Sequence, residues 1–198
     1  MSPRYPRDWW LENIVTGFTI VVLAVTSRRY VFSATSYTLA VVFTAIHTMA
    51  AHYTYSEVPL DAWMEALTGR PMAHWTGWER NHFDRLVHFL YGLLLLWPFR
   101  EVFFHMATPR HALWGYLLPF SFILSTSLGY EMLEWLAAVV LGGDAGMEFL
   151  GTQGDIWDAH WDLLAATLGA AMATGVMVAI RAATGRDFAR EWGEASVR

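Results

Sequence analysis

The chain has 198 residues, of which 55% are hydrophobic and only 16% are charged, with a formal net charge of −5. Soluble domains carry about 25% charged residues, so this composition indicates a single polytopic membrane domain over residues 1–198. The sequence contains no lysine and no cysteine. It therefore excludes covalent retinal or pyridoxal phosphate, which need a lysine amine, and covalent c-type haem, which needs cysteine. No basic patch interleaved with aromatic residues indicates nucleic-acid binding.

Five segments are long and apolar enough for membrane spans, since a helix needs about 20 mostly apolar residues to cross the hydrocarbon core. The predicted spans are 10–26, 36–53, 83–104, 112–141 and 156–180. Between the second and third spans, apolar residues from Leu60 to Leu67 recur at helical spacing. This pattern predicts a short helix lying in the membrane interface. The predicted fold is thus an all-α transmembrane bundle in contact with the lipid bilayer.

The arginines predict the orientation of this bundle. If the C-terminus is cytoplasmic, eight of the 13 arginines lie on the cytoplasmic side and five lie at the outer side. This is a modest positive-inside bias, against which Arg4 and Arg7 argue. We therefore expect a bacterial inner-membrane protein with a cytoplasmic C-terminus.

Acidic and histidine side chains converge on one end of the expected bundle. Spans alternate in direction, so the end of one span lies beside the start of the next. The outer ends of spans two to five carry His47, Asp84, His88, Glu131, Glu134, Asp155, Asp158 and Asp162. The inner halves of these spans are expected to be almost purely apolar, which makes the asymmetry informative.

Such a cluster needs compensation, because each charged group inside a membrane costs at least ~2.5–3.5 kcal/mol and like charges repel. A bound cation, ion pairs with Arg80 and Arg85, or protonation would supply it. Carboxylates and imidazoles are ligands of zinc, manganese and iron, and facing helices build such sites in bundles. We therefore predict that all eight clustered residues are metal ligands and that Arg85 binds the charge of a substrate. The alternative is an arginine-paired network that only holds the helices together.

Three separated blocks in this region, FDRLVHF, EMLEW and FLGTQGDIWDAHWD, resemble the signature motifs of the YjdF-like family. This is a family of bacterial inner-membrane proteins with a domain of unknown function, and the resemblance covers about residues 47–173. It implies a multi-pass inner-membrane protein but no particular activity. Its recurring polar residues correspond to Asp84, Arg85, His88, Glu131, Glu134, Asp155, Asp158 and Asp162. A weaker likeness to VanZ-like membrane proteins rests on Glu131, the loop 151–154, Asp158 and Gly169.

Three functions fit these observations. One is a metal-dependent enzyme that hydrolyses or modifies lipids, with no residue assigned to catalysis from the sequence. Another is a non-catalytic accessory or scaffold subunit of a larger respiratory or photosynthetic complex in the inner membrane. The third is a transporter, which the expected absence of a polar path through the inner half argues against.

Overall fold

The structure is a computed structural model that describes residues 6–27, 29–78, 80–107, 109, 111–141 and 152–195. Within these ranges the chain forms helices and no strand, so the predicted all-α class is confirmed. In chain order the elements are α1 (Pro6–Thr26), α2 (Ala34–His52), η1 (Tyr55–Glu57), α3 (Leu60–Thr68), α4 (Met72–Thr76), α5 (Phe83–Ala107), α6 (Trp114–Leu141), α8 (Asp158–Thr184) and α9 (Phe188–Ala195). The first part of the block FLGTQGDIWDAHWD lies outside the described residues.

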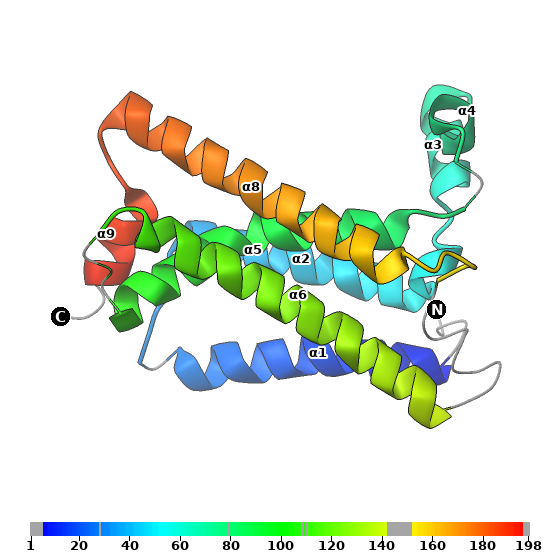
Figure 1. Cartoon of the computed structure of the whole chain (residues 1–198), viewed down its shortest axis with the longest axis horizontal. Helices are drawn as coiled ribbons and strands as arrows, with labels where there is room; N and C mark the ends of the chain where they lie inside the picture. The colour runs from blue at the N-terminus through cyan, green and yellow to red at the C-terminus, as the bar shows by residue number, and fades with distance from the viewer. Residues whose placement is uncertain are drawn as a thin grey trace.

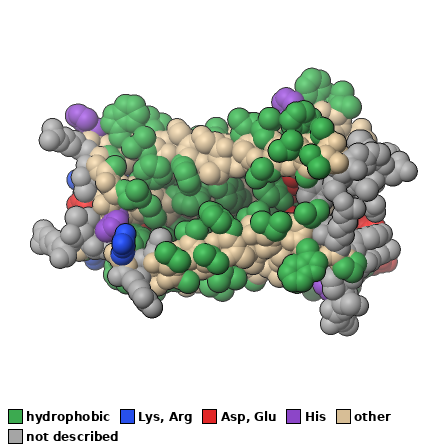
Figure 2. Space-filling model, turned by 90° about the horizontal axis from the view of Figure 1, so that it is seen from below, with side chains coloured by type: hydrophobic (Ala, Val, Ile, Leu, Met, Phe, Trp, Pro, Cys, Tyr) green, Lys and Arg blue, Asp and Glu red, His purple; other side chains and the backbone are tan. Residues whose placement is uncertain are grey.

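The five long helices run lengthwise through the molecule (Figure 1). Four of them, α2, α5, α6 and α8, are long and apolar enough to cross a membrane, and α1 contributes a shorter apolar helix. Their bounds agree with the predicted spans to within four residues at each end. Hydrophobic side chains cover the length of the face in Figure 2, whereas histidine and charged side chains gather toward its ends. This distribution suits a polytopic membrane protein surrounded by lipid.

Helix α5 is the centre of the bundle and contacts α2, α6, α8 and α9. It approaches α8 most closely, because both helices have glycine at the crossing. A Cβ atom on Gly92 would lie 2.1 Å from the carbonyl oxygen of Ala166, and one on Gly169 would lie 2.0 Å from that of Phe89. Close backbone approach through small residues is a common way to pack membrane helices. This contact fixes the start of α8 beside the start of α5.

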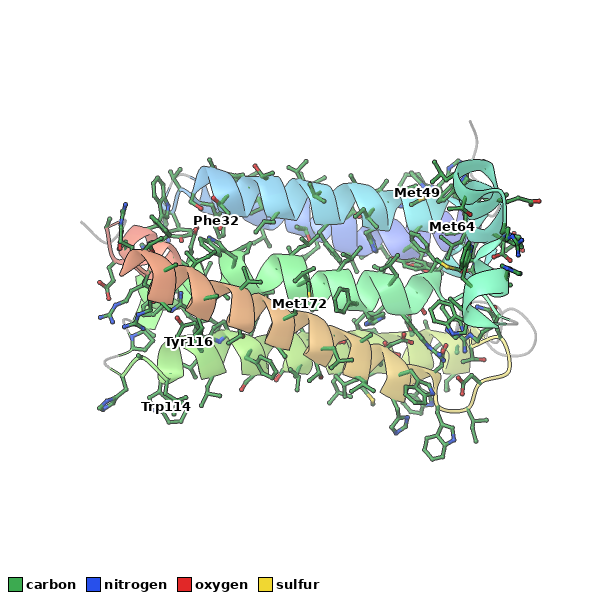
Figure 3. All side chains as sticks on the ribbon, turned by 90° about the horizontal axis from the view of Figure 1, so that it is seen from above. Phe32, Met49, Met64, Trp114, Tyr116 and Met172 are labelled. Carbon is green, nitrogen blue, oxygen red and sulfur yellow. The ribbon has the colours of Figure 1, made fainter. Side chains whose placement is uncertain are left out.

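The connection between α2 and α5 forms two short helices, α3 and α4, where the sequence predicted one. Gly69, which follows α3, has a φ of 77°, a left-handed conformation that ends a helix readily. The side chain of Asp61 then accepts a hydrogen bond from the backbone N–H of Ala73 at 3.1 Å, which ties the two helices together. In Figure 3 Met64 of α3 lies at the same end of the bundle as Met49 of α2.

The opposite end of α5 corrects the expectation that the inner halves of the spans are almost purely apolar. Arg100 and Glu101 are fully buried there. The Arg100 guanidinium donates to Asp187 at 2.6 Å and to the carbonyl oxygen of Gly115 at 2.9 Å, and it stacks 4.0 Å from the centre of the Tyr116 ring. Figure 3 shows Tyr116 at this end. The partners come from distant parts of the chain, so sequence spacing did not reveal them.

The buried carboxylate of Glu101, like the Arg100 guanidinium, has hydrogen-bond partners within the protein. This carboxylate accepts hydrogen bonds from the backbone N–H of Ser33 at 3.1 Å, from the Ser33 hydroxyl and from the Trp97 indole at 2.9 Å. Ser33 is the N-cap of α2 and accepts from the N–H of Ser36. Glu101 thus supplies, from another helix, the acid that a capping box usually places on the capped helix itself. The sequence analysis also missed α9, which packs on α5 at this end.

Candidate functional site

The predicted polar cluster lies at the end of the bundle where α5 begins. The side chain of Asn81 accepts from the backbone N–H of Phe83 at 2.9 Å, which caps the first turn of α5. Asp84 and His88 then follow one turn apart on the same face. The Nε2 atom of His88 lies 3.7 Å from Asp84 Oδ1 and 3.2 Å from Glu131 Oε1 of α6. An imidazole therefore sits between two carboxylates from different helices.

Asp162 of α8 completes this inner group. It is only 1% exposed, and its Oδ1 atom has no hydrogen-bond partner in the described part of the chain. One ligand atom each from Asp84, His88 and Asp162 lies within 4.8 Å of the other two. Buried polar atoms normally have partners, because an unsatisfied buried group costs free energy. The orphaned oxygen therefore points to something that a protein hydrogen bond does not supply.

An outer group of two arginines and two aspartates covers this inner group. Arg80 contacts Asp158 at 2.7 Å and Arg85 contacts Asp155 at 2.6 Å, with longer cross contacts of 3.4 Å that close the square. The pKa of Asp155 is lowered, first by the hydrogen bond from the backbone N–H of Trp157 and then by Arg85 and Arg80. The two positive charges are thus matched by two carboxylates. Arg85, predicted to bind substrate charge, contacts aspartates in this arrangement.

The inner group has no such match. Among the described residues, the ion pairs of Arg80 and Arg85 reach only Asp155 and Asp158. Glu134, on α6, adds a further carboxyl that interacts with Tyr130 and with the charges of Asp84 and Glu131. Negative charge therefore accumulates inside the ring of arginines. A cation or bound protons must offset it, because like charges at short range disfavour ionisation.

Among the described residues, His47 is not part of the group of possible metal ligands, and it belongs to a chain of hydrogen bonds. Its Nε2 donates to the backbone oxygen of Glu12 at 3.2 Å, since a carbonyl only accepts. Its Nδ1 is then the acceptor for the Tyr55 hydroxyl. The Tyr130 hydroxyl donates to the Glu12 carboxylate at 2.9 Å. Both ring nitrogens of His47 are thereby used in joining α1, α2 and η1.

The sequence analysis missed two residues of this arrangement, Glu12 and Tyr130. Glu12 is 5% exposed on α1. It is an acid in an apolar span, so the same cost argument that singled out Asp84 would have found it. Tyr130 gave no such signal, because a tyrosine near a span end is common in membrane proteins. The structure thus brings Asp84, His88, Glu131, Glu134 and Asp162 to one end of the bundle, with Asp155 and Asp158 in the outer group at the same end.

Comparisons with known proteins agree with this description. A family model described as "Predicted membrane protein (DUF2238)" matches residues 1–183. The chain is also similar to the inner membrane protein YjdF of Escherichia coli K12, with 34% identity over 170 residues, which cover 86% of this chain and 77% of the relative. The resemblance to the YjdF-like family is thereby confirmed. No solved structure matches the chain closely enough to indicate homology.

Proposed function

We propose that this chain, which belongs to the DUF2238 family of predicted membrane proteins, binds a divalent metal ion between α5 and α8. The ligands are Asp84, His88 and Asp162, with Glu131 beside them. The observation that carries the proposal is the buried Oδ1 atom of Asp162, which has no hydrogen-bond partner among the described residues, on a side chain that lies close to Asp84 and His88. A single cation bound there would both contact this oxygen and offset the excess negative charge.

The residues fit such an ion in kind and in spacing. Carboxylate and imidazole ligands suit zinc, manganese or iron. In a tetrahedral site, two ligand atoms that each lie ~2.1 Å from the ion are ~3.4 Å apart. The three atoms lie within 4.8 Å of one another, so they would approach one another by at most ~1.4 Å to share an ion. The Ser127 hydroxyl lies 3.3 Å from His88 Nδ1. If the Ser127 oxygen accepts a hydrogen bond from the N–H at Nδ1, the other ring nitrogen, Nε2, carries no proton. Nε2 lies on the side of Asp84 and Glu131 and is then available for the ion.

The proposed activity is hydrolysis or modification of a lipid in the bacterial inner membrane. A bound divalent ion would supply Lewis-acid polarisation of a carbonyl or phosphoryl oxygen and a lowered pKa for bound water. Glu131, beside His88, is placed to accept and return a proton. Arg85 would bind an anionic substrate by releasing Asp155, its ion-pair partner, and pairing with the substrate instead. We further propose that the C-terminus, at the end opposite the metal site, faces the cytoplasm, as the arginine bias suggests.

Metal content tests the proposal. We expect the protein purified without chelator to carry about one divalent ion per chain, measured by elemental mass spectrometry. Asp162→Asn and His88→Gln should each lower this content at least tenfold, because each removes a ligand. The matched controls Asp155→Asn and His160→Gln alter an outer aspartate and an exposed histidine on the same side, and should keep the ion. Equal metal content in the wild type and in both ligand variants would sink the proposal.

The accessory-subunit hypothesis stays a prediction and makes a different claim. It expects the protein to migrate on native gels only within a larger complex, and it expects Asp162→Asn to leave the metal content unchanged. A metal-loaded protein that migrates alone would argue against it.

A further inference from the structure

A small pocket opens beside the outer group of charges. Its volume is about 150 Å³, and it lies between the α3–α4 pair and the residues that lead into α5. Val58, Leu60 and Met72 provide apolar walls, and the polar lining includes Asp61 and Arg80. Sites for drug-sized ligands start at roughly 300 Å³. The pocket is therefore large enough for a small polar headgroup but not for a whole lipid.

Arg80 connects this pocket with the proposed metal site. Its Nη1 donates to the backbone oxygen of Thr152 at 3.0 Å, and its Nη2 lies 2.7 Å from Asp158, one turn before the ligand Asp162. The Nε atom is buried and has no hydrogen-bond partner within the ranges that the structure describes. A guanidinium can use several donors at once on different acceptors. Arg80 therefore has a donor that an anionic oxygen in the pocket would reach if the side chain turns toward it, while its contacts with Thr152 and Asp158 hold the start of α8.

The pocket also contains groups that favour a positive charge. Asp61 uses its Oδ1 atom to accept from the N–H of Ala73, and its carboxylate keeps a negative charge on the pocket wall. Trp78 is 45% exposed, and the centre of its ring lies 4.4 Å from that of His82, with the two ring planes tilted by 55°. Indole faces attract cations, and tryptophan favours the level of lipid headgroups. One cationic residue, one anionic residue and an aromatic ring thus share one small space.

We propose that this pocket binds a zwitterionic phosphoethanolamine headgroup, with its phosphate at Arg80 and its ammonium group at Asp61 and Trp78. The inference rests on the proposed function, because it assigns a substrate class to the same site. The phosphate of a phospholipid held in this way would contact Arg80. Arg80 itself contacts Asp158, which lies one turn before Asp162 on α8. A purely anionic headgroup would meet Arg80 but would be repelled by Asp61, which gives the pocket a preference.

Native mass spectrometry of the delipidated full chain tests this preference. The protein is titrated with phosphatidylethanolamine or phosphatidylglycerol of identical acyl chains, and soluble phosphoethanolamine is added as a competitor. We expect at least fivefold tighter binding of phosphatidylethanolamine. Asp61→Asn should abolish the preference, and Arg80→Gln should weaken both lipids about tenfold, as expected for a lost hydrogen bond to a charged group. The exposed neighbours give the controls Glu65→Gln and Arg70→Gln, which should match the wild type.

The outcomes separate the possible ligands. Competition by millimolar phosphoethanolamine supports recognition of the headgroup alone. A preference that survives the competitor but disappears in Asp61→Asn supports the intact lipid as the ligand. No preference in the wild type, or a preference unchanged in Asp61→Asn, overturns the inference. Because Asp61 lies outside the ion-pair square, that variant should fold even if Arg80→Gln does not.

Metal content measured in the same samples separates this inference from the proposed function. A metal-loaded protein without lipid preference overturns only the headgroup pocket. A lipid preference in a protein that never carries metal overturns only the proposed metal site.

Discussion

The two ends of α5 carry buried charges in opposite states of satisfaction. At the C-terminal end, Arg100 and Glu101 have their partners within the protein, from Asp187, Gly115 and Ser33. At the N-terminal end, the arginines of the outer group balance two aspartates, and the carboxylates inside it have no arginine among the described contacts. Both ends have polar residues in apolar helices. They differ in whether the chain itself supplies the compensation.

This difference separates structural from functional polarity in a membrane bundle. A closed network needs nothing further and serves to hold α2, α5, α6 and α9 together. An open network has carboxylates that the described residues do not pair with an arginine, which makes it the better candidate for the proposed ion.

Removing Arg100 should damage the closed end severely. Arg100→Met leaves the carboxylate of Asp187 without its main partner, and breaking a buried pair in this way costs ~3–5 kcal/mol. We expect a loss of this size in the free energy of unfolding, measured in mixed micelles. The double variant Arg100→Met/Asp187→Leu should recover much of it, because a buried ion pair can often be replaced by apolar residues. No difference between the single and double variants would contradict the closed-network interpretation.

Separating α5 from α8 should damage the open end. In Gly169→Ala the new Cβ meets the backbone oxygen of Phe89, so the helices must move apart. Overpacking of this kind costs ~1–3 kcal/mol, and it should also weaken metal binding because Asp162 moves with α8. Gly175→Ala is the matched control, since a Cβ there meets nothing within 4 Å. Thermal unfolding and metal titration should show both effects in Gly169→Ala and neither in the control.

The same chemical change should have opposite effects at the two ends. Glu101→Gln replaces an acceptor of three hydrogen bonds and should destabilise the protein by ~1.5 kcal/mol. Asp162→Asn removes one of several crowded negative charges, so the metal-free protein should be as stable as the wild type or more so. Unfolding of both variants in the presence of a chelator compares them directly. If Asp162→Asn destabilises the metal-free protein, the Asp162 carboxylate has a stabilising partner within the protein, and the contrast between the two ends is wrong.

The smallest expected effect is a pH dependence at the closed end. Burial tends to raise the pKa of Asp187, but the hydrogen bond and charge of Arg100 outweigh it, and the pKa is lowered. A group with a lowered folded pKa stabilises the protein fully above its unfolded pKa of ~3.9, and this stabilisation disappears as pH falls through the folded pKa. The unfolding temperature should therefore fall below about pH 4. Asp187→Asn should lack this step and should be less stable than the wild type at pH 7.

The spans and the end at which the acids gather were predictable from the sequence, because both follow from local patterns. Apolar length fixed the helices to within a few residues, and alternating span direction brought Asp84 and Asp162 together. The separation of roles within the cluster was not predictable. Whether an aspartate faces Arg80, as Asp158 does, or remains without a partner, as Asp162 Oδ1 does, depends on rotations of whole helices.

The closed end and α9 were missed for a related physical reason. Arg100 and Glu101 look like ordinary residues near a span end, where long side chains commonly reach the interface. Their burial depends on contacts with Ser33 and Asp187, which are 68 and 87 residues away in the chain. Such long-range pairing leaves no periodic signal. By contrast, Glu12 could have been found from the sequence, because it is an acid within a predicted membrane span, where a charge is costly.

We propose that a divalent ion lies between Asp84, His88 and Asp162. The most direct test is a crystal structure of the purified protein grown with Mn²⁺, with anomalous diffraction recorded above and below the manganese edge. We expect one anomalous peak in contact with the carboxylates of Asp84 and Asp162 and with the imidazole of His88. An ordered structure without that peak, in which Asp162 Oδ1 bonds a water molecule or a protein donor instead, would contradict it.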